Sequence, residues 1–263
     1  MTAAGVKFAA RGRKALSQIG YARAEVKAIG RGDEGHLKIG IFSSLASGFL
    51  RELISEFRKH HTSVCIAFVD GNPADHVAAV RRSQLDVAFI TGTTDWAGCQ
   101  SEHLWSERIF AVLPEDHPQA RCDEVSFASL AEETFVVSEC APGEEIRDYL
   151  VQRLAGLGHH PDIQQQAVGR DNLMLLVALG QGLTVTSEAT TGAQFPKVVY
   201  RPIVDETLPF SAVWSPKNES PAFLRLLSLA RLMSSSADKR EVSVQHPYGS
   251  PHAALSRSRD PSP

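Results

Sequence analysis

Hydrophobic residues recur with two different spacings along the chain. Before residue 31 they return every three or four positions, at Leu16, Ile19, Ala22, Val26 and Ile29. This spacing predicts a helix with one narrow apolar stripe, which is typical of a helix that pairs with another chain. A surface helix packed on its own domain is the alternative interpretation. The glycines between Gly30 and Gly35 are expected to end this helix.

From residue 37 onward, short apolar runs alternate with amphipathic segments. The runs predict strands at residues 37–42, 64–69 and 85–90. The segments between them predict helices, whose apolar faces include Leu53 and Val77. A β-α-β-α-β order predicts a parallel, doubly wound sheet, with a ligand crevice at the carboxyl ends of its strands.

A second lobe is expected after a strand at residues 108–113. Further strands are predicted at 134–137, 163–168 and 183–186, and helices at 144–155 and 172–179. Residues 198–203 are expected to cross back, after which a strand at 208–214 and a helix at 222–233 complete the first lobe.

The predicted organisation therefore has three parts. A linker or dimerisation helix occupies residues 1–31, and a two-lobed α/β domain occupies 35–236. Its first lobe comprises 35–115 and 204–236, and its second lobe comprises 116–203. Residues 237–263 are rich in Ser, Pro, His and Arg, and we expect them to be disordered.

Composition and charge exclude some classes of protein. The chain has 263 residues, 43% of them hydrophobic, and a net charge of -3, so the whole chain is not a general polyanion binder. Residues 1–31 nevertheless hold seven basic residues and one acidic residue. No apolar run is long enough to cross a bilayer and no signal peptide is visible, so we expect a cytoplasmic protein without a membrane partner.

Metal and cofactor chemistry finds little support in the sequence. The four cysteines are far apart and form no close pair of the kind that zinc sites use; they are Cys65, Cys99, Cys122 and Cys140. Adjacent histidines at 60–61 and 159–160 would point in different directions on a helix. We therefore expect no metal site and no cofactor.

Candidate ligand residues follow from the expected topology. Polar residues stand after the first-lobe strands at Ser43, Ser44, Asn72 and Thr91. Helix N-termini at such places favour anionic groups. For each of the two serines and for Asn72, capping the following helix is the alternative interpretation.

The second lobe offers a matching set. Ser138 follows a strand, and Thr184 or Thr186 lies on the strand after a glycine turn. Arg170 is the nearest candidate partner for a carboxylate, although it could equally be a solvated residue at the start of a helix. A polar, hydroxyl-rich site of this kind is compatible with a small carboxylate or an aromatic acid.

Several segments, in order and at regular intervals, resemble motifs of the LysR-type bacterial transcriptional regulators. They are Thr2-Ala3-Ala4-Gly5, Gly35-His36-Leu37-Lys38-Ile39-Gly40, Leu85-Asp86-Val87-Ala88-Phe89, Pro114-Glu115-Asp116-His117-Pro118 and Leu179-Gly180-Gln181-Gly182-Leu183. Each motif is weak alone, and their joint order over residues 2–236 is specific. The resemblance implies a two-lobed effector domain of the type 2 periplasmic-binding-protein-like fold. It also implies a small-molecule effector in the interlobe cleft and assembly as a homodimer or homotetramer.

The sequence departs from the family pattern in places. Thr62, Ser83-Gln84 and Ser187 replace residues that the family often has, and Ser187 leaves the second-lobe wall of the cleft open to question. The family reads DNA with a helix-turn-helix that precedes the Thr-x-Ala-Gly motif. We expect this chain to lack one, and to reach DNA only through a missing or partner helix-turn-helix. A truncated gene or a misassigned start codon would account for that.

The leading interpretation is thus the effector-sensing and oligomerisation portion of a transcriptional regulator. One alternative is a two-lobed solute-binding protein for transport, which predicts an export signal. Another is a dominant-negative partner that lacks a helix-turn-helix and pairs with intact regulators. An enzyme is not expected, because Gly-x-Ser-x-Gly, His-Glu-x-x-His and Walker motifs are all missing.

Overall fold

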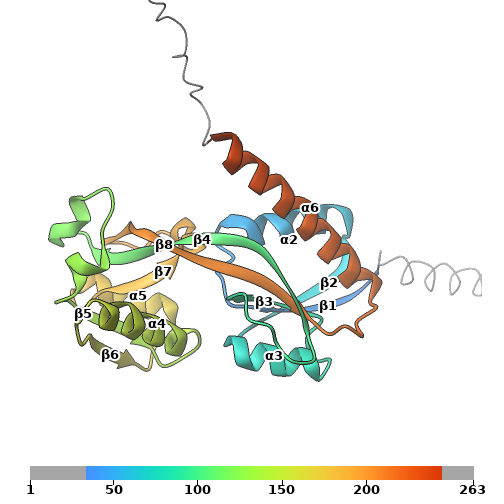
Figure 1. Ribbon diagram of the computed structural model, residues 1–263, viewed down its shortest axis with the longest axis horizontal. Helices are drawn as coiled ribbons and strands as arrows, with labels where there is room; N and C mark the ends of the chain where they lie inside the picture. The colour runs from blue at the N-terminus through green and yellow to red at the C-terminus, as the bar shows by residue number, and fades with distance from the viewer. Residues whose placement is uncertain (1–33, 245–263) are drawn as a thin grey trace, which may run out of the picture.

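Two α/β lobes, joined by a pair of long strands, make up the described part of the chain (Figure 1). The structure is a computed structural model that describes the backbone of residues 34–244 and the side chains of residues 35–236. The linker helix expected at residues 1–31 lies outside the described residues and stays a prediction.

The first lobe contains the predicted alternation of strands and helices. It runs β1 (Glu34–Ile41), α2 (Gly48–His60), β2 (Ser63–Asp70), α3 (Pro73–Arg81) and β3 (Val87–Thr91). Strand β1 is parallel to both β2 and β3, as the alternation predicts. Leu53 and Phe57 of α2 are fully buried against Leu37 and Ile39 of β1. The apolar period of the sequence therefore sets both the elements and the core of this lobe.

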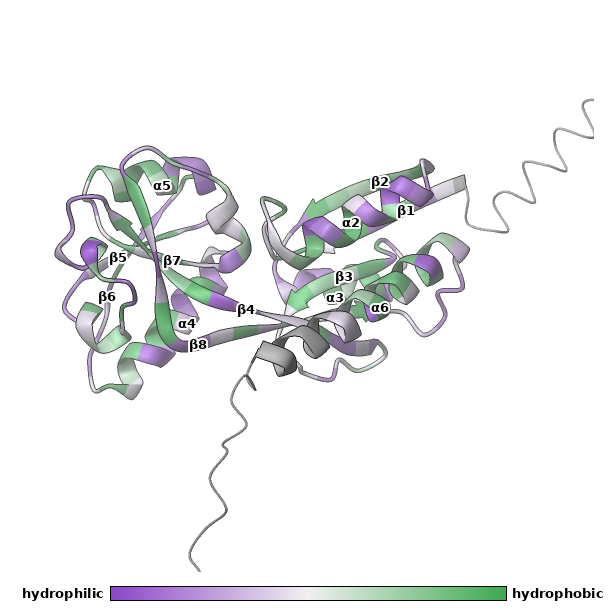
Figure 2. Ribbon diagram, turned by 90° about the horizontal axis from the view of Figure 1, so that it is seen from above, coloured by the Kyte–Doolittle hydropathy of each residue, from purple (hydrophilic) through white to green (hydrophobic). Residues whose placement is uncertain are grey.

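Strands β4 (Gln100–Pro114) and β8 (Val198–Trp214) connect the lobes. They pair antiparallel with each other, and β8 also pairs antiparallel with β3 (Figure 2). The parallel pairing predicted for the first three strands is confirmed, and antiparallel pairing begins at β8, because one connecting strand leaves the first lobe and the other returns to it. The full sheet order is β2-β1-β3-β8-β4-β7.

The second lobe repeats the alternation. It contains β5 (Thr134–Ser138), α4 (Gly143–Gly156), β6 (Asp162–Gln166), α5 (Arg170–Ala178) and β7 (Thr184–Ser187). Strands β5 and β6 are parallel, while β7 pairs with β4. Short 3-10 turns follow β4 and β7, at η1 (Pro118–Arg121), η2 (Phe127–Leu130) and η3 (Glu188–Gly192). Phe135, Leu150 and Leu154 are fully buried in its core.

Helix α6 (Pro221–Val244) returns to the first lobe and contacts α2, β1 and β4. It extends past the predicted end at residue 233, so residues 237–244 are helical where the sequence predicts disorder. Arg231 anchors the helix through a bidentate ion pair with Glu102. Residues 245–263 lie outside the described residues. Within the described part, no helix has the length and apolar character that crossing a membrane requires.

Candidate ligand-binding site

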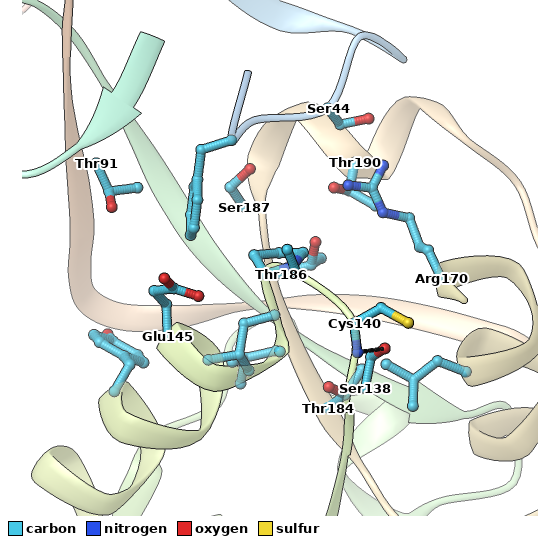
Figure 3. Close-up of a pocket in the computed structure, with 18 of the residues that line it drawn as sticks. Ser44, Thr91, Ser138, Cys140, Glu145, Arg170, Thr184, Thr186, Ser187 and Thr190 are labelled. Carbon is cyan, nitrogen blue, oxygen red and sulfur yellow. Dashed lines mark hydrogen bonds between the residues drawn. The ribbon is translucent and has the colours of Figure 1, made fainter. Parts of the chain in front are cut away.

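A cleft of about 660 Å³ opens between the two lobes. The first lobe lines it with the ends of β1 and β3, and the second lobe with the end of β5, the first turns of α4 and α5, and β7 (Figure 3). These are the carboxyl ends of strands and the N-termini of helices, where α/β folds bind ligands.

Six of the eight predicted site residues line this cleft. They are Ser44, Thr91, Ser138, Arg170, Thr184 and Thr186. Ser43 and Asn72 do not line it, and both make contacts with other protein groups instead. A role in ligand binding stays a prediction for all eight.

Ser43 belongs to a buried cluster centred on Glu107 of β4. The Ser43 hydroxyl donates a hydrogen bond of 3.0 Å to Glu107 Oε1, and Trp105 Nε1 donates one of 2.8 Å to the same oxygen. The backbone N–H of Ala189 donates to Glu107 Oε2 at 3.2 Å. Glu107 is only 5% exposed. The cluster therefore joins the loop after β1, strand β4 and η3 at the junction of the lobes.

No motif in the sequence singles out Glu107. The available signal is strand alternation, which puts Glu107 on the same face as the apolar Trp105 and Ile109. A carboxylate in such a setting needs several donors, because burial of an unpaired charge is very costly.

Asn72 stands at the N-cap position of α3, before Pro73, but its side chain makes no cap hydrogen bond. The prediction that it caps the helix is therefore wrong for the side chain. With the amide nitrogen turned toward α4, Nδ2 donates to Glu145 Oε2 at 2.8 Å and to Oε1 at 3.2 Å. Asn72 thus links the first lobe to the second.

Ser138 fixes the turn between β5 and α4. Its hydroxyl donates to the carbonyl of Val168 at 2.6 Å and accepts from the N–H of Cys140 at 2.9 Å. A Cβ at Gly143 would lie 1.7 Å from the Ser138 carbonyl oxygen, so this position has room only for glycine. Together these residues set the N-terminus of α4 against the cleft.

Thr184 differs from the other hydroxyl residues. It is 1% exposed, it lines the cleft, and its Oγ1 has no hydrogen-bond partner among the described residues. A buried hydroxyl without a partner costs about 1–3 kcal/mol. Such groups in native proteins call for an explanation, and a ligand atom is one.

The charged groups of the cleft stand apart from one another. Glu145 and Arg170 lie on opposite sides of it, with Thr186 between them (Figure 3). Burial raises the pKa of Glu145 above its ordinary value of 4.5, and the negative charges of Glu144, Asp148 and Asp75 raise it further. Arg170 forms no ion pair or hydrogen bond with residues 34–236 and is exposed. In the sequence, Glu145 is distinguished only by its place near the start of the helix predicted at 144–155.

The fold and the cleft define a two-lobed domain of the periplasmic-binding-protein type. Residues 30–233 match the LysR substrate binding domain, and the chain belongs to that family. It carries the effector-binding domain of a LysR-type transcriptional regulator.

Relatives and solved structures agree with this assignment. The uncharacterized HTH-type transcriptional regulator YnfL of Escherichia coli K12 is 28% identical over 84% of this chain and 76% of its own. XapR of the same organism is 23% identical over 87% of this chain and 78% of its own. The fold is similar to CbnR, at a TM-score of 0.74 and 16% identity over 88% and 81% of the two chains. It is also similar to the effector binding domain of BenM with its effector benzoate. The TM-score is 0.67 and the sequence identity is 20%, over 78% of this chain and 94% of the BenM chain.

Proposed function

We propose that the interlobe cleft binds a small metabolite carrying a carboxylate, aromatic acids included, and that binding regulates transcription. The observation that carries this proposal is the buried Thr184 hydroxyl, which has no hydrogen-bond partner among the described residues and lies in the same cleft as the Arg170 guanidinium. An anionic group between them would accept hydrogen bonds from both. The benzoate bound by a protein of similar fold supports this ligand class.

Local structure adds to the attraction for an anion. Helices α4 and α5 both begin at the cleft, with Gly143 and Arg170 as their first residues. The first N–H groups of a helix have no partner within the helix and carry a partial positive charge. Apolar side chains of Ile41, Phe42 and Ile146 also line the cleft, and they offer contacts for a ring or an aliphatic chain.

Regulation requires that the ligand favour one arrangement of the protein over another. We propose that the effector closes or reorients the lobes and so changes the spacing of linker helices in a homodimer or homotetramer. DNA would be contacted through a helix-turn-helix, in the cytoplasm, and the chain would act by binding rather than by catalysis. The cluster around Glu107 would transmit the change, since it connects both lobes at their junction.

Titration calorimetry with benzoate and a series of small aliphatic carboxylates tests the proposal. We expect binding by at least one acid, and loss of its affinity in Thr184→Val and in Arg170→Ala. Small-angle scattering with and without that acid should report a changed subunit arrangement. An acid that binds equally well to all three proteins, or that leaves the arrangement unchanged, would count against this mechanism.

A further inference from the structure

The cleft carries more negative than positive charge. Among its lining residues, Asp70, Glu145, Asp148 and Asp171 are acidic and Arg170 alone is basic. A ligand with only negative charge would be repelled by three or four carboxylates while it gained one guanidinium. The charge of the wall therefore calls for a ligand that also carries a cation.

Glu145 is the carboxylate best placed to meet that cation. Figure 3 shows it pointing into the cleft from the first turn of α4. Within the described residues, no basic side chain forms an ion pair with it, because nearby Arg147 pairs with Asp148 at 2.9 Å and with Glu144 at 4.0 Å. Among the described side chains, only the neutral Asn72 of the first lobe donates to Glu145. Its negative charge is thus left without a protein counter-charge.

A metal ion is a poor candidate for the cation. No group of three His, Cys, Asp or Glu side chains within residues 35–236 is placed to hold a metal. A single carboxylate paired with an amide is instead a suitable acceptor for an ammonium group, which donates three hydrogen bonds.

We propose that the effector is a zwitterion, with an ammonium group bound by Glu145 and a carboxylate bound on the side of Thr184 and Arg170. This rests on the proposed function, since it assumes that the cleft is the effector site. The buried Thr184 hydroxyl without a partner is the independent sign of a ligand at the anionic end. The opposite placement of Glu145 and Arg170 matches the two charges of such a molecule.

Asn72 gives the ammonium end a link to both lobes. It belongs to the first lobe, and its amide nitrogen donates to both oxygens of Glu145 in the second. An ammonium at Glu145 would therefore bind at a contact that already spans the cleft. In this arrangement Asn72 is a positioning residue that orients the carboxylate.

Matched pairs of probes test this, each pair sharing a skeleton and differing in the amino group. Calorimetry would compare L-phenylalanine with 3-phenylpropanoate, L-leucine with 4-methylpentanoate, and 4-(aminomethyl)benzoate with 4-methylbenzoate. We expect the amino form to bind about tenfold more tightly in at least one pair, the factor of one charge-assisted hydrogen bond. Glu145→Gln should remove that preference without weakening the acid that lacks the amino group, because the substitution also removes a negative charge that repels that acid.

Two controls separate a local effect from a general one. Glu144→Gln removes an acid on the same helix that does not line the cleft, and it should keep the preference. The denaturation midpoint of Glu145→Gln should show that the variant is folded. Acids that bind equally well with and without an amino group, a preference that persists in Glu145→Gln, or a panel without any amino-acid binder would each overturn the inference. Equal binding within the pairs would leave the proposed anion site intact, whereas insensitivity to Thr184→Val and Arg170→Ala would refute that site itself.

Discussion

The two walls of the cleft use similar residues in different ways. In the first lobe, the hydroxyl of Ser44, which lines the cleft, accepts from the N–H of Ala46 at 3.1 Å, and the hydroxyl of the adjacent Ser43, which does not line it, is bonded to Glu107. In the second lobe, Thr184 has no hydrogen-bond partner among the described residues. Ser138 is the exception on that wall, because its hydroxyl is bonded to Val168 and Cys140. A polar residue at the end of a strand thus marks the cleft, but its partners decide whether it is available to a ligand.

The largest expected effect tests the structural role of the Glu107 cluster, which holds Ser43 next to the first-lobe wall. Glu107→Ala would leave Ser43, Trp105 and Ala189 without their acceptor in a buried place. We expect a loss of about 3 kcal/mol or more in the free energy of unfolding, measured by urea denaturation. Glu102→Ala is the control, since it breaks only the partly exposed pair with Arg231 and should cost about 1 kcal/mol or less. Similar losses in both variants would show that the Glu107 cluster stabilises the fold no more than an ordinary surface ion pair does.

A slightly smaller effect concerns the backbone of the second wall. Gly143→Ala would place a methyl group against the Ser138 carbonyl and displace the start of α4. We expect it to cost about 2–3 kcal/mol, as overpacking does. Gly156 lies in the same helix, and a Cβ there meets no atom within 4 Å. Gly156→Ala should therefore be neutral or slightly stabilising, by up to about 1 kcal/mol. Thermal unfolding of both variants measures the contrast, and equal midpoints would contradict it.

A third pair of variants compares a hydroxyl that forms two hydrogen bonds with one that has no hydrogen-bond partner among the described residues. Ser138→Ala removes two hydrogen bonds and should cost about 1–2 kcal/mol. Thr184→Val removes a hydroxyl that has no described partner, so it should raise the free energy of unfolding by about 1 kcal/mol. Opposite signs in urea denaturation of the ligand-free protein are expected. A loss of stability in Thr184→Val would mean that its hydroxyl contributes to the fold rather than to a ligand.

The sequence predicts which residues line the cleft better than it predicts their hydrogen-bond partners. Strand ends and helix starts can be located from apolar periodicity, which is why Ser44, Thr91 and Thr184 reach the cleft wall as expected. Hydrogen-bond partners cannot be located in this way. Ser43 meets Glu107, which is 64 residues away, and Ser47 donates to the Ala189 carbonyl, which is 142 residues away. Such pairs depend on how two lobes meet, and no local pattern encodes that.

The connecting strands show a similar limit. The sequence predicts separate strands at 198–203 and 208–214, because polar residues from Asp205 to Thr207 interrupt the apolar pattern. The structure has the single strand β8, in which Asp205 has a positive φ of 58° and pairing with β4 shifts register between Arg108 and Phe110. An irregularity of this kind lets one strand pass from lobe to lobe, and it is seen only when both strands are placed.

The smallest expected effect concerns pH and separates Glu145 from an ordinary surface acid. Burial and neighbouring carboxylates raise the pKa of Glu145 above 4.5, so the folded state binds a proton more tightly than the unfolded state. The stability of the ligand-free protein relative to Glu145→Gln should therefore be highest below pH 4.5 and fall as pH rises through the raised pKa.

Glu56 is the control with the opposite pH dependence, because hydrogen bonds from Lys59 and then His60 lower its pKa. Stability relative to Glu56→Gln should be present above pH 4.5 and be lost as pH falls. Urea denaturation of the three proteins between pH 4 and 7 measures both slopes. Slopes of the same sign would mean that the fold stabilises the Glu145 carboxylate, as hydrogen bonds stabilise that of Glu56, and the uncompensated charge that calls for a ligand ammonium would then be absent.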